Sequence, residues 1–204
     1  MKLSTDLASG KALVSEVAEA GENCGRELLG QLATRAAALS DGDTQIVDID
    51  WTVVRLRAES QTVVAEEPDY ARNAGEFVPS LSVTCHILGL QRKLLGTLNA
   101  EDQPVGGQQY ARVSLEALRA ASVVGHRLKD DEKPFTGWQI VSTAPVRNQN
   151  YGLYSIRELA AQRLEWLVAM RLPTGWSFRY VGRTLVDCVS LAGRTFELNL
   201  SVEF

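Results

Sequence analysis

Two Gly-Trp pairs constrain the fold of this 204-residue chain more than any other feature. One stands in the run Thr136-Gly137-Trp138 and the other in Thr174-Gly175-Trp176. A glycine adopts the positive φ of a tight turn at little steric cost, and a tryptophan anchors the strand that follows against a core. Strand-like sequence follows both pairs, so we expect the last third of the chain to consist largely of turns and short strands.

The composition is that of an ordinary globular protein, with 45% hydrophobic and 23% charged residues. Such a length allows one large domain or two small ones. No apolar run reaches the roughly 20 residues that a membrane span needs. The N-terminal residues lack the continuous apolar stretch of a secretory signal. We therefore expect a cytoplasmic protein that does not contact a membrane.

The first half of the chain predicts helices followed by strands. Residues 4–39 carry apolar residues at helical spacing, interrupted near residues 21–25, which predicts two helices or one bent helix. Period-two alternation over residues 46–57 predicts a strand with a hairpin partner at 61–65, and residues 68–79 predict a loop. Strand-like and helical spacing compete over residues 81–98, where we favour a helix from residue 82. Residues 100–109 are rich in turn formers and predict a second loop.

The second half predicts strands around one main helix. We expect a short helix at 114–121, strands at 122–128 and 138–142, and polar turns at 130–134 and 148–152. Ser155 and Glu158 form a capping-box pattern that opens a helix over 155–171, and three strands follow at 177–181, 186–191 and 196–202. The sequence thus predicts an α+β fold with N-terminal helices, mixed helix and strand, and a C-terminal antiparallel sheet with one packed helix. The expected domains are 1–108 and 109–204, or one continuous domain.

Charge is unevenly distributed along the chain. Residues 1–126 hold 17 acidic and 11 basic residues, whereas residues 127–204 hold 8 and 10. Acidic clusters of this kind attract a basic protein surface, although they also serve simply as a solvated face. The basic residues form no tract with interleaved aromatics, so we expect no nucleic-acid binding.

The residue types that carry catalysis are sparse and scattered. Three cysteines lie far apart without metal-ligand spacing, and adjacent acids such as Glu66 and Glu67 are typical of a solvated turn rather than of an acid–base pair. We therefore predict no catalytic residues, no cofactor and no metal site. An alternative is an enzyme whose site is assembled from distant residues such as Cys85, His126 and Asp187.

Aromatic residues gather near predicted turns in the second half of the chain. Tyrosine and tryptophan are frequent at binding hot spots and equally frequent as core anchors. We place Trp138 and Trp176 in the core, whereas Tyr151 stands in a polar, Asn-rich turn and is predicted to contact a partner.

A longer pattern surrounds the Gly-Trp pairs. Val123-Val124-Gly125-His126-Arg127 is followed by a short polar turn and Thr136-Gly137-Trp138, and later by Asn150-Tyr151-Gly152 and Pro173-Thr174-Gly175-Trp176. Over residues 113–181 this pattern resembles the bacterial immunity-protein-thirty-three-like domains, in which Ser-Gly-Trp follows a strand that ends in arginine. Here Thr136 stands in place of the serine. The resemblance does not explain residues 1–112.

The resemblance implies a function. Proteins of this group are encoded beside polymorphic toxins and are inferred to protect the producing cell by binding its toxin. On this basis we expect a non-catalytic immunity protein that covers the active site of a cognate toxin effector. The candidate partner-binding residues are Asp48, Asp50, Glu66, Glu67, Asp69, Tyr70, Tyr151 and Tyr154. The alternative is a scaffold or adaptor of a secretion system or phage particle that oligomerises through helix 4–39, and the sequence leaves the oligomeric state open.

Overall fold

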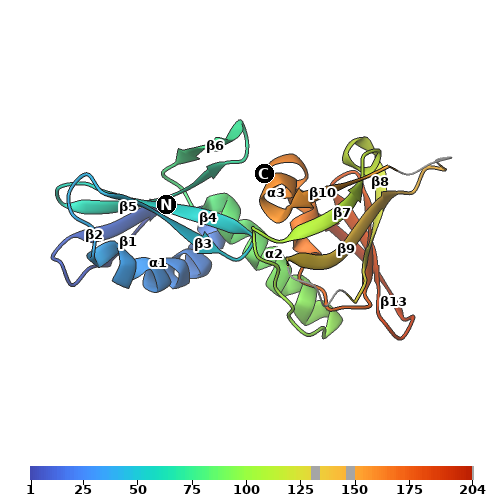
Figure 1. The fold of residues 1–204 in the computed structure, drawn as a ribbon. Helices are drawn as coiled ribbons and strands as arrows, with labels where there is room; N and C mark the ends of the chain where they lie inside the picture. Colours follow the sequence, from blue (N-terminus) through green and yellow to red (C-terminus); the bar gives the residue numbers. More distant parts are fainter. Residues whose placement is uncertain (130–133, 146–149, 204) are drawn as a thin grey trace. The chain divides into compact units, whose positions relative to one another are not determined.

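The computed structural model describes residues 1–129, 134–145 and 150–203. The chain divides into two compact units, Met1–Leu90 and Gln91–Phe204, and helix α2 (Ser82–Leu98) crosses the border between them. In Figure 1 the first unit runs from blue to green and the second from green to red. Whether two parts fold independently, as the expected domains 1–108 and 109–204 imply, stays a prediction.

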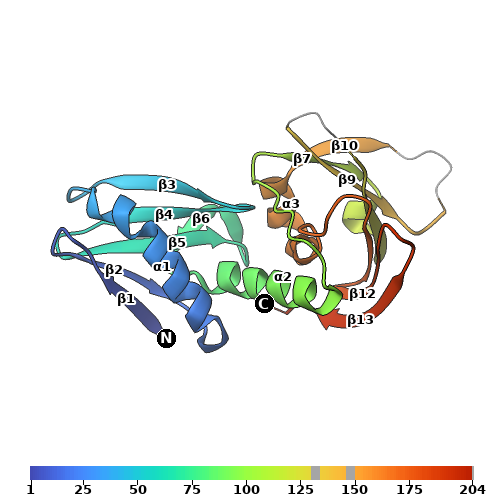
Figure 2. The same cartoon turned by 90° about the horizontal axis from the view of Figure 1, so that it is seen from below.

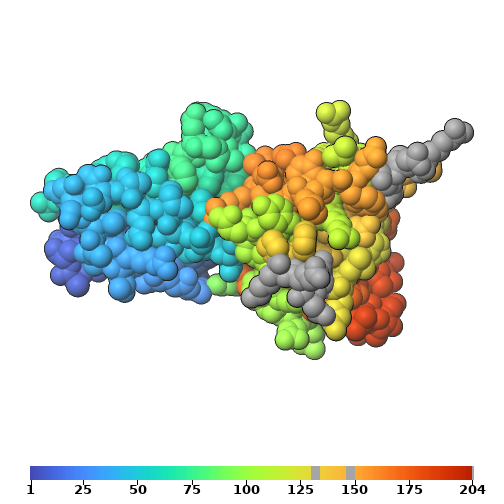
Figure 3. Space-filling model, viewed as in Figure 1, coloured from blue at the N-terminus to red at the C-terminus, as the bar shows by residue number. Residues whose placement is uncertain are grey.

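The first unit consists of a mixed sheet with one long helix. Its strands follow the order β1-β2-β5-β4-β3, with β6 paired to β5, and only the β2–β5 pair is parallel. Helix α1 packs against the sheet, and Leu28, Leu29 and Leu32 join its core. The hairpin of β5 and β6 stands out at the top of this unit in Figures 1 and 3. The elements are β1 (Lys2–Asp6), β2 (Ala12–Glu16), η1 (Glu19–Gly21), α1 (Glu22–Ala37), β3 (Thr44–Ile49), β4 (Thr52–Ala58), β5 (Thr62–Asp69) and β6 (Asn73–Val78).

The second unit is a seven-stranded sheet of order β10-β7-β9-β8-β11-β12-β13. The β7–β9 pair is parallel and the other pairs are antiparallel. Figure 2 shows the sheet curving around α3, which lies on its concave side. Its elements are β7 (Tyr110–Ser114), η2 (Ala117–Arg119), β8 (Ser122–Arg127), β9 (Phe135–Ser142), β10 (Tyr151–Ser155), α3 (Ile156–Gln162), η3 (Leu164–Val168), β11 (Ser177–Val181), β12 (Thr184–Val189) and β13 (Thr195–Ser201).

Aromatic side chains fill the concave side of this sheet, which we call the inner face. The ring centroid of Phe178 lies 5.0 Å from that of Trp138 and 5.5 Å from that of Tyr180. The Tyr180 hydroxyl donates to the carbonyl oxygen of Glu165 in η3 at 2.6 Å. The segment α3–η3 therefore closes the core against the inner face, as the burial of Trp166, Leu167 and Val168 also indicates.

The predicted fold class is wrong, because the chain is mostly β and does not begin with helices. Residues 4–16 lie in the hairpin of β1 and β2, and only the later part of the predicted helix 4–39 forms, as α1. Residues 68–79 are not simply a loop, since they contain β6 and the end of β5. The C-terminal sheet is mixed rather than antiparallel, and β7 was not expected.

Other predicted elements are confirmed. Helix α2 spans the favoured range 82–98, and α3 begins with the predicted capping box, in which the Ser155 hydroxyl accepts from Glu158 N–H. The predicted helix 155–171 is shorter, because it ends at Gln162 and continues as the 3₁₀ segment η3. Residues 130–133 of the predicted turn at 130–134 and residues 148–149 of that at 148–152 fall outside the described residues, whereas Tyr151 and Gly152 begin strand β10 rather than form a turn.

Candidate protein-binding site

The two Gly-Trp pairs meet at the end of β8, on either side of Arg127. The Arg127 N–H donates to Trp176 O at 2.9 Å, and Gly175 N–H donates to Arg127 O at 2.7 Å. On the other side, Arg127 lies opposite Trp138 in the β8–β9 pair. The two motifs that dominate the sequence therefore form one structural centre rather than two.

The Arg127 side chain is 4% exposed and is held by carbonyl oxygens. Its Nε donates to Thr136 O at 3.1 Å, and its Nη1 donates to Gln103 O and Leu172 O at 2.7 Å each and to Met170 O at 3.3 Å. Burial lowers the pKa of Arg127 to about 10. The guanidinium donates to these backbone carbonyl oxygens, and it joins β8 to β9, to the loop before β7 and to the segment after η3, which is a structural role.

Gly137 allows β9 to approach the chain that leaves β8. Its φ is +78°, and a Cβ at this position would lie 2.2 Å from the carbonyl oxygen of Leu128. The Gly137 carbonyl in turn accepts from Leu128 N–H at 2.9 Å. No residue with a side chain fits here without moving the backbone, which explains why a glycine precedes Trp138.

The opposite, outer face of the sheet carries a group of aromatic, apolar and basic side chains. The register places Leu153 opposite Arg112, Tyr151 opposite Ser114, and Tyr110 opposite Phe135. Leu128 follows β8 on the same face, because it lies beside Gly137. We call this group the outer patch, and its members are Tyr110, Arg112, Leu128, Phe135, Tyr151 and Leu153.

The outer patch is exposed and slightly hollowed. Tyr151 is 43% exposed and Leu153 54%, and Tyr110 and Leu128 are also exposed. A shallow hollow of about 210 Å³ lies above Gly137, with Phe135 and Arg112 among its lining residues. The Arg112 guanidinium lies 6.0 Å from the centre of the Phe135 ring. Tyrosine and arginine around a depression are typical of the central part of a protein interface.

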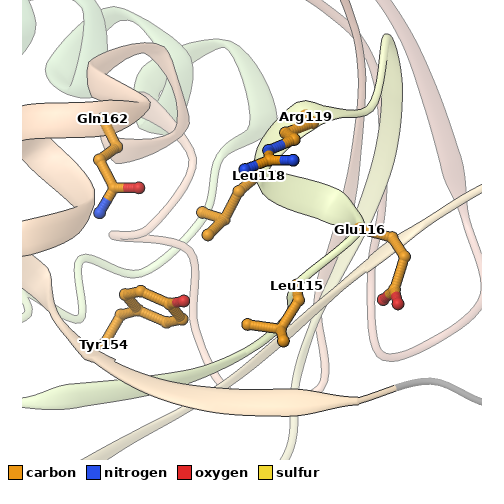
Figure 4. A pocket seen from close by; sticks show the side chains of 6 residues that line it. All are labelled: Leu115, Glu116, Leu118, Arg119, Tyr154 and Gln162. Carbon is orange, nitrogen blue, oxygen red and sulfur yellow. The ribbon is translucent and has the colours of Figure 1, made fainter.

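A second hollow lies beside β10, on the side of the inner face. Its volume is about 570 Å³, and Figure 4 shows the six side chains that line it: Leu115, Glu116, Leu118, Arg119, Tyr154 and Gln162. The Tyr154 ring reaches the hollow because it lies across Gly152, where a Cβ would meet the ring at 2.7 Å. The two candidate tyrosines of β10 therefore point to opposite faces, Tyr151 into the outer patch and Tyr154 into the hollow.

Glu66 and Glu67 are buried, in contrast to the solvated turn that their sequence indicates. Adjacent residues of a strand point to opposite faces. Glu66, 3% exposed, accepts hydrogen bonds from Arg55 Nε at 2.5 Å and Arg57 Nη2 at 3.0 Å. Glu67, 1% exposed, accepts from the N–H groups of Val83 and Thr84 at 3.0 and 2.7 Å. Both carboxylates therefore hold the first unit together.

Glu67 lies at the N-terminal end of α2, where main-chain N–H groups lack partners within the helix. Burial raises the pKa of Glu67, and the hydrogen bonds from α2 offset this only in part. The strand β5 and the helix α2 are thus joined by a carboxylate that pairs with N–H groups rather than with a cation.

The remaining candidate residues of the first unit lie in or near turns. Asp48 is exposed on β3, and Asp50 takes a φ of +46° in the turn between β3 and β4. The Asp69 carboxylate accepts from the N–H groups of Ala71 and Arg72 at 3.2 and 3.1 Å. The Tyr70 hydroxyl lies 2.5 Å from that of Thr52, and burial raises the pKa of Tyr70.

The three residues of the alternative enzyme are divided between the two units. Cys85 is buried in the first unit, while Asp187 in the second unit accepts from Arg179 Nε at 2.7 Å. His126 is exposed on the outer face of β8. Within the described parts of the chain, no cluster of three or more His, Cys, Asp or Glu side chains has the arrangement of a metal site. No helix in those same parts is long and apolar enough to cross a membrane.

The second unit is therefore a curved, mixed β-sheet whose inner face is packed and whose outer face has the composition of a protein interface. Residues 90–189 match the family model of the Imm33-like domain. The chain thus contains an Imm33-like domain, which begins at the border of the second unit and includes the predicted range 113–181. Neither the curated proteins nor the solved structures include a match.

The sequence pointed to Tyr151 but missed most of the outer patch. The signal was available, since Tyr110-Ala111-Arg112-Val113 alternates between exposed and buried residues. The alternation covers only four residues and follows a predicted loop, so alternation alone did not identify a strand there. Leu128 and Phe135 flank the polar turn and join the patch only through the β8–β9 register.

Proposed function

We propose that this chain is a non-catalytic immunity protein that binds a cognate toxin effector and neutralises it by covering the toxin's active site. The Imm33-like match supports the class, and the outer patch is the observation that carries the proposal. An exposed sheet face with two tyrosines, a phenylalanine and an arginine supplies the anchors that slow dissociation of a protein complex.

The charges of the two units support a division of roles. The first unit holds 14 acidic and 7 basic residues, a net −7, whereas the second holds 11 and 14, a net +3. Acidic groups accelerate the capture of a basic toxin, and the predicted contacts Asp48, Asp50 and Asp69 belong to the acidic unit. Glu66 and Glu67 were predicted contacts as well, but a substitution there also disturbs the buried pairs of the first unit.

The experiment tests whether the chain captures a toxin and whether it rescues cells that express the toxin. The tagged chain is used to capture partners from the native host, and the product of the adjacent gene is expressed alone and together with the chain. We expect stoichiometric capture of a toxic protein and restored growth on co-expression. Failure of the chain to bind or to rescue against the adjacent toxin would overturn the proposal.

Two substitutions locate the interface. Tyr110→Lys and Arg112→Glu change exposed side chains of the outer patch and are expected to weaken toxin binding at least about tenfold each, as hot-spot residues do. Val181→Lys is the matched control, because Val181 is exposed on the same sheet face but on β11, away from the outer patch. Equal effects of all three would argue against the outer patch as the contact surface.

The acidic contacts have a separate readout. Asp48→Asn combined with Asp69→Asn is expected to slow association and to reduce its dependence on salt, while the dissociation rate changes little. If the double substitution leaves the association rate and its salt dependence unchanged, the first unit is not part of the interface.

A further inference from the structure

The edge strand β10 lacks the features that normally protect a sheet edge. Its residues, Tyr-Gly-Leu-Tyr-Ser, include no charge and no proline, and its pairing with β7 contains no bulge. The other edge strand, β13, carries Glu197, and its pairing with β12 contains a register shift. Natural proteins use charges, prolines and bulges to prevent edge strands from pairing, so an edge without them is suited to accept another strand.

The register shows which main-chain groups of β10 face outward. Leu115 N–H donates to Asn150 O and Ile156 N–H donates to Gln109 O, both at 2.9 Å. These pairs stand at the two ends of the β10–β7 ladder, and hydrogen-bonded pairs alternate along an antiparallel ladder. Gly152 and Tyr154 therefore bond to β7, whereas the N–H and C=O of Leu153 point away from the sheet. Within the described residues, neither group of Leu153 has a partner.

We propose that β10 pairs with β10 of a second copy of this chain, in antiparallel orientation about a two-fold axis at Leu153. Each Leu153 N–H then donates to the Leu153 C=O of the other copy. A two-fold contact of this kind requires a self-complementary surface, and a central residue with one outward donor and one outward acceptor meets that requirement. The two sheets would form one continuous sheet across the axis.

The side chains on the inner side of β10 fit this arrangement. In the proposed register, Tyr154 of the second copy lies opposite Gly152, which has no side chain to oppose it. The hollow of about 570 Å³ that Tyr154 lines also lies on this side of β10, and its other lining residues come from residues 115–119 and α3. Each Tyr154 ring already lies across Gly152 of its own strand, so the glycine keeps this side of the strand pair free of a second bulky side chain.

Charge does not oppose the pairing. Arg112, the neighbour of Leu153 on β7, is separated from its symmetry mate by three strand spacings, about 14 Å. That distance exceeds the screening length of about 8 Å at physiological ionic strength. The five residues of β10 that would meet in the dimer are uncharged. A second copy of β10 therefore brings no charge next to this edge, whereas a charged strand would.

The test is sedimentation of the intact chain, without toxin, over concentrations below and above the expected dissociation constant. A single strand pair forms a small interface, for which we expect a Kd on the order of 10 µM. The measured mass should rise with concentration from 22.3 kDa towards twice that value. Because no toxin is present, this result is independent of the proposed function.

Leu153→Pro isolates the main-chain contribution. Proline removes the outward N–H of Leu153 but no hydrogen bond to β7, and edge strands tolerate it at such positions. The proline variant should weaken dimerisation at least about tenfold, because symmetry removes two hydrogen bonds at once. Leu153→Ala removes the side chain and keeps the N–H, so it should weaken dimerisation less. Val181→Ala, on the distant strand β11, should leave the Kd unchanged.

Circular dichroism and thermal unfolding establish that each variant is folded. A folded chain that stays monomeric well above the expected Kd would overturn the proposal, and so would a dimer that Leu153→Pro leaves intact. If the chain is monomeric but Leu153→Pro abolishes toxin capture, the edge serves a strand of the toxin. That outcome would overturn the second-copy proposal while supporting the proposed function.

Discussion

The guanidinium of Arg127 and the indole of Trp138 donate to the same acceptor, the carbonyl oxygen of Met170. The distances are 3.3 Å from Arg127 Nη1 and 3.0 Å from Trp138 Nε1, and the guanidinium carbon lies 5.8 Å from the Trp138 ring centre. The arginine that ends β8 and the tryptophan of the first Gly-Trp pair are therefore coupled through the main chain after η3. This coupling gives the sequence pattern of the Imm33-like domain a physical meaning.

Arg127→Met should destabilise the chain by about 3 kcal/mol or more, because it leaves several buried carbonyl oxygens without a donor. Trp138→Phe should cost about 2 kcal/mol, through the lost N–H and the smaller ring. The two losses should not add in the double variant, since both residues share Met170 O. Urea unfolding of the four proteins measures the coupling, and strict additivity would show that the shared acceptor is unimportant.

Gly137→Ala should cost clearly more than Gly193→Ala. The two glycines have nearly the same φ, +78° and +76°, so both substitutions carry the strain of a left-handed backbone, about 1 kcal/mol. Only at Gly137 does the new Cβ meet a backbone atom, whereas the space at Gly193 is open. We expect a total loss of at least about 2 kcal/mol at Gly137. Equal midpoints in urea unfolding would contradict the close approach at Leu128 O.

Glu67 should make the stability depend on pH. Its pKa in the folded chain is raised above the ordinary value of 4.5, so the folded state binds the proton more tightly than the unfolded state does. The contribution of Glu67 to the free energy of unfolding is therefore fully present below about pH 4.5 and is lost as the pH rises through the raised pKa. Glu67→Gln cannot titrate and should lack this dependence.

The measurement for Glu67 is the difference in unfolding free energy between the parent and Glu67→Gln at a series of pH values. The difference should move in favour of the glutamine variant as the pH rises from 4.5 towards neutrality. Subtraction removes the contribution of the other titrating groups. A difference that is flat, or that moves the other way, would mean that the α2 hydrogen bonds outweigh burial.

The three cysteines should resist thiol reagents in the folded chain. All three are buried and outside disulfides, and burial raises the pKa of Cys188 to about 12, which suppresses the reactive thiolate. Mass spectrometry after alkylation should find no label under native conditions and three labels in denaturant. Rapid native labelling at Cys188 would contradict its position in the core.

Sequence patterns identified the elements whose signals are local. Helix α2 has apolar residues at helical spacing from Ile87 to Leu98, and α3 begins with a capping box that needs only Ser155 and Glu158. The same reasoning failed at residues 4–16, because Leu7, Val14 and Val17 fit a helical stripe. The turn near Gly10, whose φ is +82°, makes these residues part of a hairpin and its flanking turns instead.

The partners of Glu66 and Glu67 and the membership of the outer patch could not be predicted from local sequence patterns, because both depend on how strands and helices pair. Glu66 and Glu67 are separated by the two faces of β5, and their partners come from β4 and α2. The outer patch collects Leu128, which follows β8, and residues from three strands whose order, β10-β7-β9, includes a parallel pair. Only the pairing of strands brings Tyr110, Phe135 and Leu153 to one surface, and a single sequence does not specify that pairing.

The positions of the Arg127 acceptors in the sequence also determine when this core can form during synthesis of the chain. Met170 and Leu172 lie 43 and 45 residues beyond the arginine, so the ribosome must add that length before the guanidinium has all its carbonyl partners. At about 5–20 residues per second, this delay lasts roughly 2–9 s. During that interval β8 and β9 can form a hairpin, but the cation at its end remains hydrated. The core around Arg127 therefore closes only after Leu172 has been added, and the aromatic side chains of β11 follow within a few residues.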